Sequence, residues 1–332
     1  MPPENALPPL IVITGPTATG KSALGVEVAK QLGGEIVSAD SMLIYRYMNI
    51  GTAKPTLEER QGIPHYMIDL VNPDEKYSVA LYQSQATKCI EDIIKRGKIP
   101  LLVGGTGLYI RALTEQYNFP GTENNYELRQ SLARQAQKYG QEALHARLVQ
   151  IDPATAVRLH PNDLKRVIRA LEVYYLTGKP FSYFQKREQK EKYNLIMYGI
   201  NMERQLLYHK IEERVDKMIR LGLVEEVQNL LNKGYDIGST SLQGLGYKEI
   251  IAYLKGENTL AEAISLIKRN TRHFAKRQLT WFKRDKRILW LKVEKGNISE
   301  VAQKIAGRYK ETSKFFKKNI SNGGFLNDQN AT

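Results

Sequence analysis

Glycine, lysine and serine are combined near the start of the chain in a spacing that suits phosphate binding. Residues 15–22 read GPTATGKS, which matches G-x-x-x-x-G-K-[ST], directly after the apolar run LIVIT and directly before a helical pattern. Glycines let backbone N–H groups surround an oxyanion, and the N-terminus of the following helix adds positive potential. Lys21 would reach terminal phosphate oxygens and the Ser22 hydroxyl would bind Mg²⁺. The pattern therefore predicts a site for a diphosphate or a triphosphate.

This phosphate-binding motif is shared by several classes of enzyme. Nucleotide kinases, GTPases and enzymes that transfer a group from a diphosphate all carry it. The sequence contains no guanine-reading N-K-x-D motif, which disfavours a GTPase. Other residues must decide between the remaining classes.

Two further groups of polar residues follow strand-like runs. Asp40 follows EIVSA, and the segment Gly104–Gly107 (GGTG) follows PLLV. Residues at the carboxyl ends of parallel strands face the ligand crevice of a doubly wound sheet. There Asp40 could hold Mg²⁺ or accept a proton, and Thr106 offers a hydroxyl, although a helix cap and a plain turn are the alternatives. Asp69, at the end of MIDL, is a weaker candidate of the same kind.

Short apolar runs and helical segments alternate along the chain. Runs as short as these suit buried strands, and the segments between them, such as Ala23–Leu32 and Val79–Lys95, have helical spacing. Alternation of this kind predicts an α/β fold, with a P-loop NTPase-like parallel sheet covered by helices. The predicted strands are Leu10–Thr14, Glu35–Ala39, Met67–Leu70, Pro100–Val103, Leu195–Ile200 and Ile288–Leu291.

The strand-like runs stop in the middle of the chain and resume later. Between about Gln116 and Lys192 the pattern is polar and helical, over Tyr126–Tyr139, Glu142–Gln150 and Leu164–Thr177. The sequence therefore predicts a helical domain inserted into the α/β core. The predicted parts are the first part of the core at 1–115, the inserted domain at 116–194, the end of the core with a basic segment at 195–312, and a disordered tail at 313–332.

Positive charge is concentrated near the end of the predicted core. The chain has 332 residues, with 49 Lys and Arg against 35 Asp and Glu, a net charge of +14. Ten basic residues and one acidic residue lie between Ile264 and Lys292. On a helix, Arg272, Lys276 and Lys283 share one face, and an apolar stripe runs along another. This pattern is typical of a helix that follows nucleic-acid phosphates, although an ordinary amphipathic surface helix has it too.

The composition also bears on where the protein works. Hydrophobic residues make up 42% of the chain, which suits a globular protein and excludes a disordered or fibrous one. The single cysteine, Cys89, cannot form an internal disulfide, which favours a reducing compartment. Apolar runs are too short to span a bilayer, and the first residues do not resemble a signal peptide. We therefore expect a cytoplasmic protein.

Six separated blocks of sequence closely resemble one family, the bacterial type of tRNA dimethylallyltransferases, also called tRNA isopentenyltransferases. The blocks occur in order from the phosphate-binding motif to the basic segment, which makes chance agreement very unlikely. They are GPTATGKS at 15–22, DSMLIYRYMNIGTAKP at 40–55, LLVGGTGLY at 101–109, HPNDLKRVIRALE at 160–172, LQGLGYKE at 242–249 and KRNTRHFAKRQLTWFKR at 268–284.

The resemblance implies a reaction. Such enzymes move a dimethylallyl group from dimethylallyl diphosphate to N6 of the adenosine at tRNA position 37, giving N6-isopentenyladenosine and releasing diphosphate. Asp40 matches the general base of the family, and Thr106 matches a position that contacts the substrate. Arg214 matches an arginine that touches the diphosphate, with a surface ion pair as the alternative. The residues implied to hold the diphosphate, with Mg²⁺ on Ser22 as cofactor, are Gly15, Pro16, Thr17, Ala18, Thr19, Gly20, Lys21, Ser22 and Arg214.

The resemblance also implies how tRNA is held. Cations would bind the phosphates of the anticodon stem-loop, and the ring of Tyr247 would stack on a base. The target base would flip out of the loop. The tRNA-binding residues would be Asp40, Ser41, Met42, Leu43, Thr106, Arg129, Lys165, Arg166, Arg169, Gln243, Gly246, Tyr247, Lys248, Arg272, Lys276, Arg277, Gln278, Trp281 and Lys283. Two positions depart from the family: Leu43 and Lys165 stand where many members have Gln.

Two other functions are compatible with parts of the sequence. A P-loop kinase for a nucleotide or a small molecule would explain residues 15–22 but not the basic segment. A non-catalytic RNA-binding protein that merely retains a nucleotide loop would explain the basic segment. The sequence favours a transferase that acts as a monomer, with tRNA and dimethylallyl diphosphate as partners and no membrane.

Overall fold

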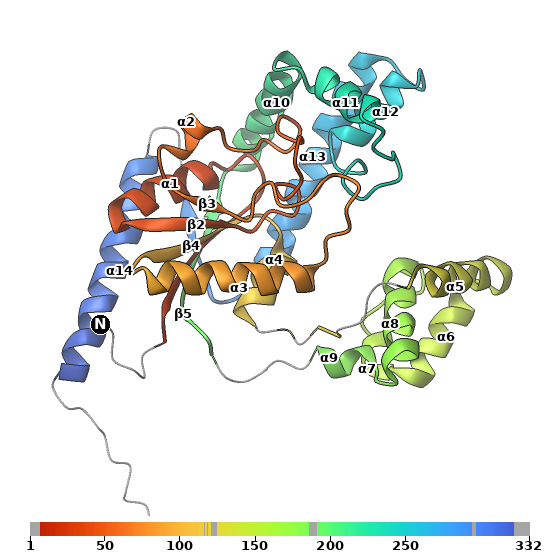
Figure 1. Cartoon of the computed structure of the whole chain (residues 1–332), viewed down its shortest axis with the longest axis horizontal. Helices are drawn as coiled ribbons and strands as arrows, with labels where there is room; N and C mark the ends of the chain where they lie inside the picture. The colour runs from red at the N-terminus through yellow and green to blue at the C-terminus, as the bar shows by residue number, and fades with distance from the viewer. Residues whose placement is uncertain are drawn as a thin grey trace, which may run out of the picture. The chain divides into compact units, whose positions relative to one another are not determined.

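The core of the protein is a parallel β-sheet. The structure is a computed structural model, and it describes residues 7–115, 117, 119–120, 125–185, 191–293 and 297–321. Within these residues six strands form one sheet in the order β3-β2-β4-β1-β5-β6, with neighbouring strands parallel (Figure 1). The predicted α/β fold with a parallel sheet is confirmed. The strands are β1 (Pro9–Thr14), β2 (Gly34–Ser38), β3 (His65–Tyr66), β4 (Ile99–Gly104), β5 (Asn194–Asn201) and β6 (Ile288–Lys292).

Helices cover both faces of the sheet because the strands are apolar on both faces. Along β1, Leu10 and Val12 belong to the cluster that contains helix α3 (Val79–Lys95). The alternate residues Ile11 and Ile13 belong to the cluster that contains helix α1 (Lys21–Leu32) and helix α14 (Ile298–Ser321). Successive side chains of a strand point to opposite faces, so a run such as LIVIT is buried only between two layers.

The sheet brings three loops to one edge. Since β1, β2 and β4 run parallel, the loops that follow them all leave the same end of the sheet. The chain passes from β1 to β2 across β4, and this crossing point is where open α/β sheets bind ligands. The side chain of Thr14 donates to the carbonyl of Gly104 (3.0 Å), which joins the first and third of these loops.

A helical layer follows the sheet in the same compact unit. The packed helices are α10 (Arg204–Arg220), α11 (Leu223–Asn232), α12 (Tyr247–Leu254) and α13 (Leu260–Phe282). Their apolar cluster also contains Ile44 and Met48, from the segment after β2. Smaller helices α2 (Leu57–Arg60) and α4 (Gly107–Thr114) complete this unit in the described part of the chain. None of the helices in that part is both long and apolar enough to cross a membrane.

Residues 115–191 form a second compact unit, separate from the first. Its helices are α5 (Tyr126–Tyr139), α6 (Gln141–Ile151), α7 (Pro153–Ala156), α8 (Leu164–Thr177) and α9 (Phe181–Phe184). Leu132, Leu148 and Leu171 are buried in a cluster that belongs to this unit alone. The first unit consists of residues 1–114 and 192–332, so the helical unit interrupts the α/β unit in sequence.

Two sequence-based expectations differ from the structure. The strand predicted at Met67–Leu70 is wrong: the strand there is β3, His65–Tyr66. Met67 and Asp69 have φ of 63° and 56°, a left-handed backbone that cannot continue a strand. The tail predicted from Ser313 is also shorter, because helix α14 continues to Ser321. Residues 322–332 lie outside the described residues.

The edge of the sheet has no room for a side chain at Gly104. A Cβ built there would lie 2.2 Å from the carbonyl oxygen of Ala39. We expect Gly104→Ala to lower the free energy of unfolding by about 3 kcal/mol, because the backbone of two loops must move apart. Urea denaturation of the whole protein measures this change.

Gly307→Ala is the matched control. Gly307 lies in helix α14, and a Cβ built there meets no atom within 4 Å. Alanine is favoured over glycine in a helix by about 0.5–1 kcal/mol, so this variant should be slightly more stable than the natural protein. Equal stability of the two variants would contradict the close packing at Gly104.

Candidate active site

The loop after β1 has the backbone shape of a phosphate-binding loop. Gly15 and Gly20 have φ of 147° and 85°, and Ala18 has φ of 63°. A Cβ at Gly15 would lie 2.9 Å from the carbonyl oxygen of Ile200 in β5, so glycine is needed at this close approach. The side chain of Thr19 donates to the carbonyl of Pro16 (2.8 Å), which closes the loop on itself. Helix α1 begins at the end of this loop, so its N-terminus faces the site.

The cations of this site repel each other. Lys21 Nζ donates to the carbonyl of Pro16 within the loop (3.2 Å). Burial lowers the pKa of Lys21 to about 8; the nearby carboxylate of Asp40 raises it and the guanidinium of Arg214 lowers it. Burial also lowers the pKa of Arg214. Two cations in poor contact with water favour an anionic ligand.

Arg214 lies on the phosphate loop and not in a surface ion pair. Its Nη1 donates to the side-chain oxygen of Thr17 (3.0 Å). Helix α10 carries Arg214 three and seven residues after the buried Ile211 and Leu207, so Arg214 lies on the buried side of that helix. The sequence left open whether Arg214 contacts the diphosphate or forms a surface ion pair. The structure places Arg214 at the phosphate loop.

The loops after β2 and β4 are joined by hydrogen bonds. Thr106 Oγ1 accepts from the backbone N–H of Ser41 (3.0 Å), and the N–H of Thr106 donates to the carbonyl of Ala39 (2.9 Å). Asp40 Oδ1 accepts from the N–H of Met42 (2.9 Å), which fixes the carboxylate. The structure therefore brings Asp40, Thr106 and Lys21 to the same edge of the sheet. Asp69, in contrast, forms an ion pair with Lys54.

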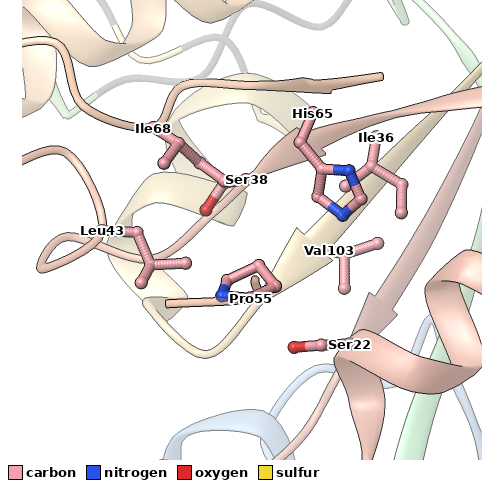
Figure 2. Close-up of a pocket in the computed structure, with 8 residues that line it drawn as sticks. All are labelled: Ser22, Ile36, Ser38, Leu43, Pro55, His65, Ile68 and Val103. Carbon is pink, nitrogen blue, oxygen red and sulfur yellow. The ribbon is translucent and has the colours of Figure 1, made fainter. Parts of the chain in front are cut away.

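A small pocket lies beside the start of α1 (Figure 2). Ser22 supplies a hydroxyl to it and Leu43 an apolar side chain. His65 also lines the pocket, and burial lowers its pKa, which favours the neutral imidazole. The remaining lining residues are Ile36, Ser38, Pro55, Ile68 and Val103. The pocket is therefore mainly apolar, with polar groups on its walls.

Helix α13 presents part of the predicted cationic surface. Lys276 and Arg277 are exposed on it, and Lys283 is exposed at its C-cap. Arg272 is half-buried, and its guanidinium pairs with the carboxylate of Glu212 on α10 (2.6 Å). Lys276, Arg277 and Lys283 are therefore the cations of this helix best placed to meet a polyanion.

Two predicted tRNA-binding residues of α13, Gln278 and Trp281, lie on the apolar stripe of the helix and contact the protein. Gln278 is only 8% exposed, and its amide bonds to Thr17 and to Gly105. Trp281 packs so closely on Gly107 that a Cβ there would lie 2.1 Å from the indole nitrogen. Both ends of the Gln278 amide are bound within the protein, and its contact with tRNA stays a prediction. The half-buried ring of Trp281 packs on α4.

The loop before α12 also differs from its prediction. Tyr247 is fully buried, and its hydroxyl donates to Glu226 (2.7 Å). The expected stacking of this ring on a tRNA base is wrong, because its faces are covered by protein. Gly246 is buried too, and its N–H donates to the side chain of Glu249. Gln243 and Lys248 are exposed, as a contact with RNA requires.

The predicted cations of the second unit fall into two groups. Lys165 and Arg166 are exposed near the start of α8, and Arg166 pairs with Asp163 (3.0 Å). Arg129 and Arg169 instead pair with the fully buried carboxylate of Glu172, at 2.8 and 2.6 Å. Buried Glu172 thus holds two of the predicted tRNA-binding arginines in place.

Sequence reasoning missed Glu226. Its carboxylate accepts the backbone N–H groups of Asn49, Ile50 and Gly51, at 2.8, 2.8 and 3.1 Å. This anchor fixes the segment that continues from Asp40. The sequence contains no local signal for it, because Glu226 lies about 175 residues after its partners.

Comparison with known proteins assigns the chain to a family. A family model described as IPP transferase matches residues 43–285, and one described as isopentenyl transferase matches residues 8–72. The chain belongs to the IPP transferase family. A relative named tRNA dimethylallyltransferase, from Pelotomaculum thermopropionicum, is 57% identical over 305 residues, which are 91% of this chain and 97% of that protein.

Solved structures agree with this family. The full-length tRNA isopentenylpyrophosphate transferase from Bacillus halodurans is 45% identical, with a TM-score of 0.68; the match covers 92% of this chain and 98% of that one. A eukaryotic dimethylallyltransferase acting on tRNA is 28% identical, with a TM-score of 0.74, over 97% of this chain and 82% of that one. The fold of the IPP transferase family and its P-loop sheet therefore extend over nearly the whole chain.

Metal binding at this site would depend on the ligand. The described residues contain no group of three or more His, Cys, Asp or Glu side chains that could hold an ion. The Ser22 hydroxyl is exposed at the start of α1, and Asp40 lies in the electrostatic neighbourhood of Lys21. Such hard oxygen donors suit Mg²⁺ when a diphosphate supplies further oxygens.

Protonation of Lys21 should control the binding of diphosphate. The pKa of Lys21 is about 8 in the site without ligand, against 10.5 for a free lysine. An anion favours the ammonium form, so affinity for inorganic pyrophosphate should be highest below pH 8. It should fall about tenfold per pH unit above that value, as Lys21 loses its proton. Titration calorimetry between pH 6.5 and 9.5 measures this dependence.

Lys21→Arg is the control for this pH dependence. A guanidinium stays charged over the whole range, and the ionisation of pyrophosphate itself is common to both proteins. The extra loss of affinity above pH 8 should therefore disappear in the variant. Superimposable pH profiles for the two proteins would show that Lys21 does not titrate in this range.

Proposed function

We propose that this protein transfers the dimethylallyl group of dimethylallyl diphosphate to N6 of adenosine 37 in tRNA, 3′ of the anticodon. The observation that carries the proposal is the meeting of the phosphate loop, Asp40 and Thr106 at one edge of the sheet. The names of the relatives, tRNA dimethylallyltransferases, point to the same reaction. It forms the bond between N6 and C1 of the prenyl group, breaks the bond between C1 and oxygen, and releases diphosphate and a proton.

Lys21, Arg214 and the backbone of the phosphate loop act on the leaving group. Negative charge grows on the diphosphate as the bond between C1 and oxygen breaks. Fixed cations in a site poor in water stabilise this charge without reorganisation. Mg²⁺, when bound to Ser22 and to the diphosphate, would add positive charge to the same oxygens. The mainly apolar lining of the pocket beside Ser22 is chemically compatible with a hydrocarbon group.

Asp40 acts on the nucleophile. The exocyclic amine of adenine is a poor nucleophile, and a positioned carboxylate that takes its proton accelerates such a step by about 10²–10⁴-fold. The bond from the N–H of Met42 to Oδ1 orients this carboxylate. Thr106 fixes the adjacent backbone at Ser41 and offers its hydroxyl at the same edge.

The tRNA is bound by its anticodon stem-loop. Lys276, Arg277 and Lys283 on α13 contact its phosphates, and the target base leaves the loop to reach Asp40. Leu43, which lines the pocket, supplies an apolar contact where many members of the family have an amide. Arg129 and Arg169, oriented by Glu172, hold the RNA from the second unit. The enzyme works as a monomer in the cytoplasm.

A kinase is the alternative that the comparisons disfavour. Relatives at more than half identity are named tRNA dimethylallyltransferases, and the match covers most of the chain. A small-molecule kinase would also leave the exposed cations of α13 without a role. The proposal therefore assigns the phosphate loop to a diphosphate leaving group.

Transfer of labelled prenyl groups tests the proposed function. The protein is incubated with Mg²⁺, dimethylallyl diphosphate carrying ¹⁴C and unmodified tRNA, and label in the tRNA is counted. We expect labelled tRNA from the natural protein and a rate about 10²–10⁴-fold lower from Asp40→Asn, because the amide cannot take the proton. Affinity for tRNA should remain in the variant. Consumption of ATP with no label in the tRNA would instead support a kinase, and equal rates would exclude Asp40 as the base.

The salt dependence of tRNA binding tests the role of α13. Each cation that contacts a phosphate releases counterions, so binding weakens as salt rises. Lys276→Ala should weaken tRNA binding at every salt concentration and reduce the slope of log K against log salt by about 0.7–0.9. Lys30→Ala, at an exposed lysine of α1 that pairs with Glu27, is the control and should keep the slope. An unchanged slope in Lys276→Ala would place the RNA elsewhere.

A further inference from the structure

Gln278 connects helix α13 to the phosphate loop. Its Oε1 accepts from the backbone N–H of Thr17 (2.9 Å), and its Nε2 donates to the carbonyl of Gly105 (2.9 Å). One end of the amide meets a donor and the other meets an acceptor, so these partners fix its orientation. The side chain is buried, which makes both bonds costly to lose. Gln278 therefore joins the loops after β1 and β4 from a third element.

Gly105 is matched to this amide. A Cβ at Gly105 would lie 2.4 Å from Nε2 of Gln278, closer than any contact allows. The absence of a side chain lets the amide reach the carbonyl of the loop. Gly105 of the GGTG segment and Gln278 of KRQLTW are far apart in the sequence but contact each other in the structure.

Thr17 is held a second time from helix α10. Arg214 Nη1 donates to its side-chain oxygen (3.0 Å), while Gln278 binds its backbone N–H (2.9 Å). Ion pairs on both sides of Arg214 join α10 to α13. They are Glu212 with Arg272 (2.6 Å) and Asp216 with Lys268 (2.6 Å). The phosphate loop is therefore attached to a pair of connected helices, one of which carries the cations assigned to tRNA.

We propose that Gln278 is a positioning residue that couples the phosphate loop to the tRNA-binding helix. When RNA binds to α13, the amide of Gln278 transmits the effect to Thr17 and Gly105. Binding of RNA therefore affects the diphosphate site. Coupling of this kind is reciprocal, so each ligand strengthens the binding of the other. The proposal rests on the proposed function for the identity of the two ligands.

Neither an aliphatic nor an acidic side chain can replace this amide. Leucine leaves the N–H of Thr17 and the carbonyl of Gly105 without partners. Glutamate still accepts from Thr17, but its carboxylate repels the carbonyl of Gly105 and the diphosphate. A contact with tRNA would predict other effects, because an RNA-reading glutamine would matter for tRNA affinity alone.

Gln278→Leu, Gln278→Glu and the control Thr280→Ala test the proposal. Thr280 is exposed on the same helix. The dissociation constant of Mg²⁺ with inorganic pyrophosphate is measured by calorimetry, with and without saturating tRNA, and that of tRNA by fluorescence. For the natural protein and Thr280→Ala we expect pyrophosphate to bind about 5–100-fold more tightly with tRNA present.

In both Gln278 variants we expect pyrophosphate to bind about 10–100-fold more weakly, which corresponds to the loss of one or two buried hydrogen bonds. The ratio of pyrophosphate affinities with and without tRNA should approach one, and kcat for prenyl transfer should fall. The affinity for tRNA alone should stay within twofold of the natural protein's. Loss of tRNA affinity with unchanged pyrophosphate affinity would overturn the proposal and make Gln278 an RNA contact. Undiminished enhancement by tRNA in the variants would overturn it as well.

The control measurements separate this proposal from the proposed function. Prenyl transfer by the natural protein tests the function, whereas pyrophosphate binding by the variants tests the role of Gln278. If Gln278→Leu fails to fold, the nearly isosteric Gln278→Glu provides the same measurement. A natural protein that transfers no prenyl group, together with weak pyrophosphate binding in the variants, would reject the function and keep the role of Gln278 at the loop.

Discussion

The site depends on positive charge that is held where water has little access. Lys21 and Arg214 lie at the same loop and each disfavours the charge of the other. Asp40 offsets part of this repulsion, and a diphosphate would offset the rest. The carboxylate that is held by a loop hydrogen bond thus stabilises the two cations, and it is the group that we propose as the base. The attraction between Asp40 and the two cations therefore contributes both to the stability of the site and to its proposed chemistry.

The parallel sheet and the helical layer keep these groups in place against their repulsion. The loops after β1, β2 and β4 are tied to each other by Thr14, Thr106 and the backbone of Ala39. The helical layer holds them from outside, through Arg214 and Gln278 on Thr17 and through Glu226 on residues 49–51. Each anchor is a buried or half-buried polar group with a specific partner, so the loops have one favoured arrangement.

The sequence was informative where a motif is continuous. GPTATGKS predicted the phosphate loop, and five of the six predicted strands overlap the observed ones, because each such run carries its own signal. The helical pattern at 79–95 predicted α3 to the residue. The expectation failed at Met67–Leu70, where two left-handed residues end the strand although the run is apolar. Composition alone does not report backbone strain at single residues.

The directions of buried side chains mark the difference between what the sequence determines and what only the tertiary structure decides. From the sequence by itself came the α/β sheet, the phosphate loop, the acid at position 40 and the basic helix, since these depend on local spacing and residue type. Only the tertiary structure decided that Tyr247 faces the protein and not solvent, that Gln278 joins two loops, and that Glu172 and Glu226 are anchors. Their partners lie 21 to 261 residues away, or on another turn of a packed helix. Burial and hydrogen bonding between distant segments arise from packing, which no single stretch of sequence contains.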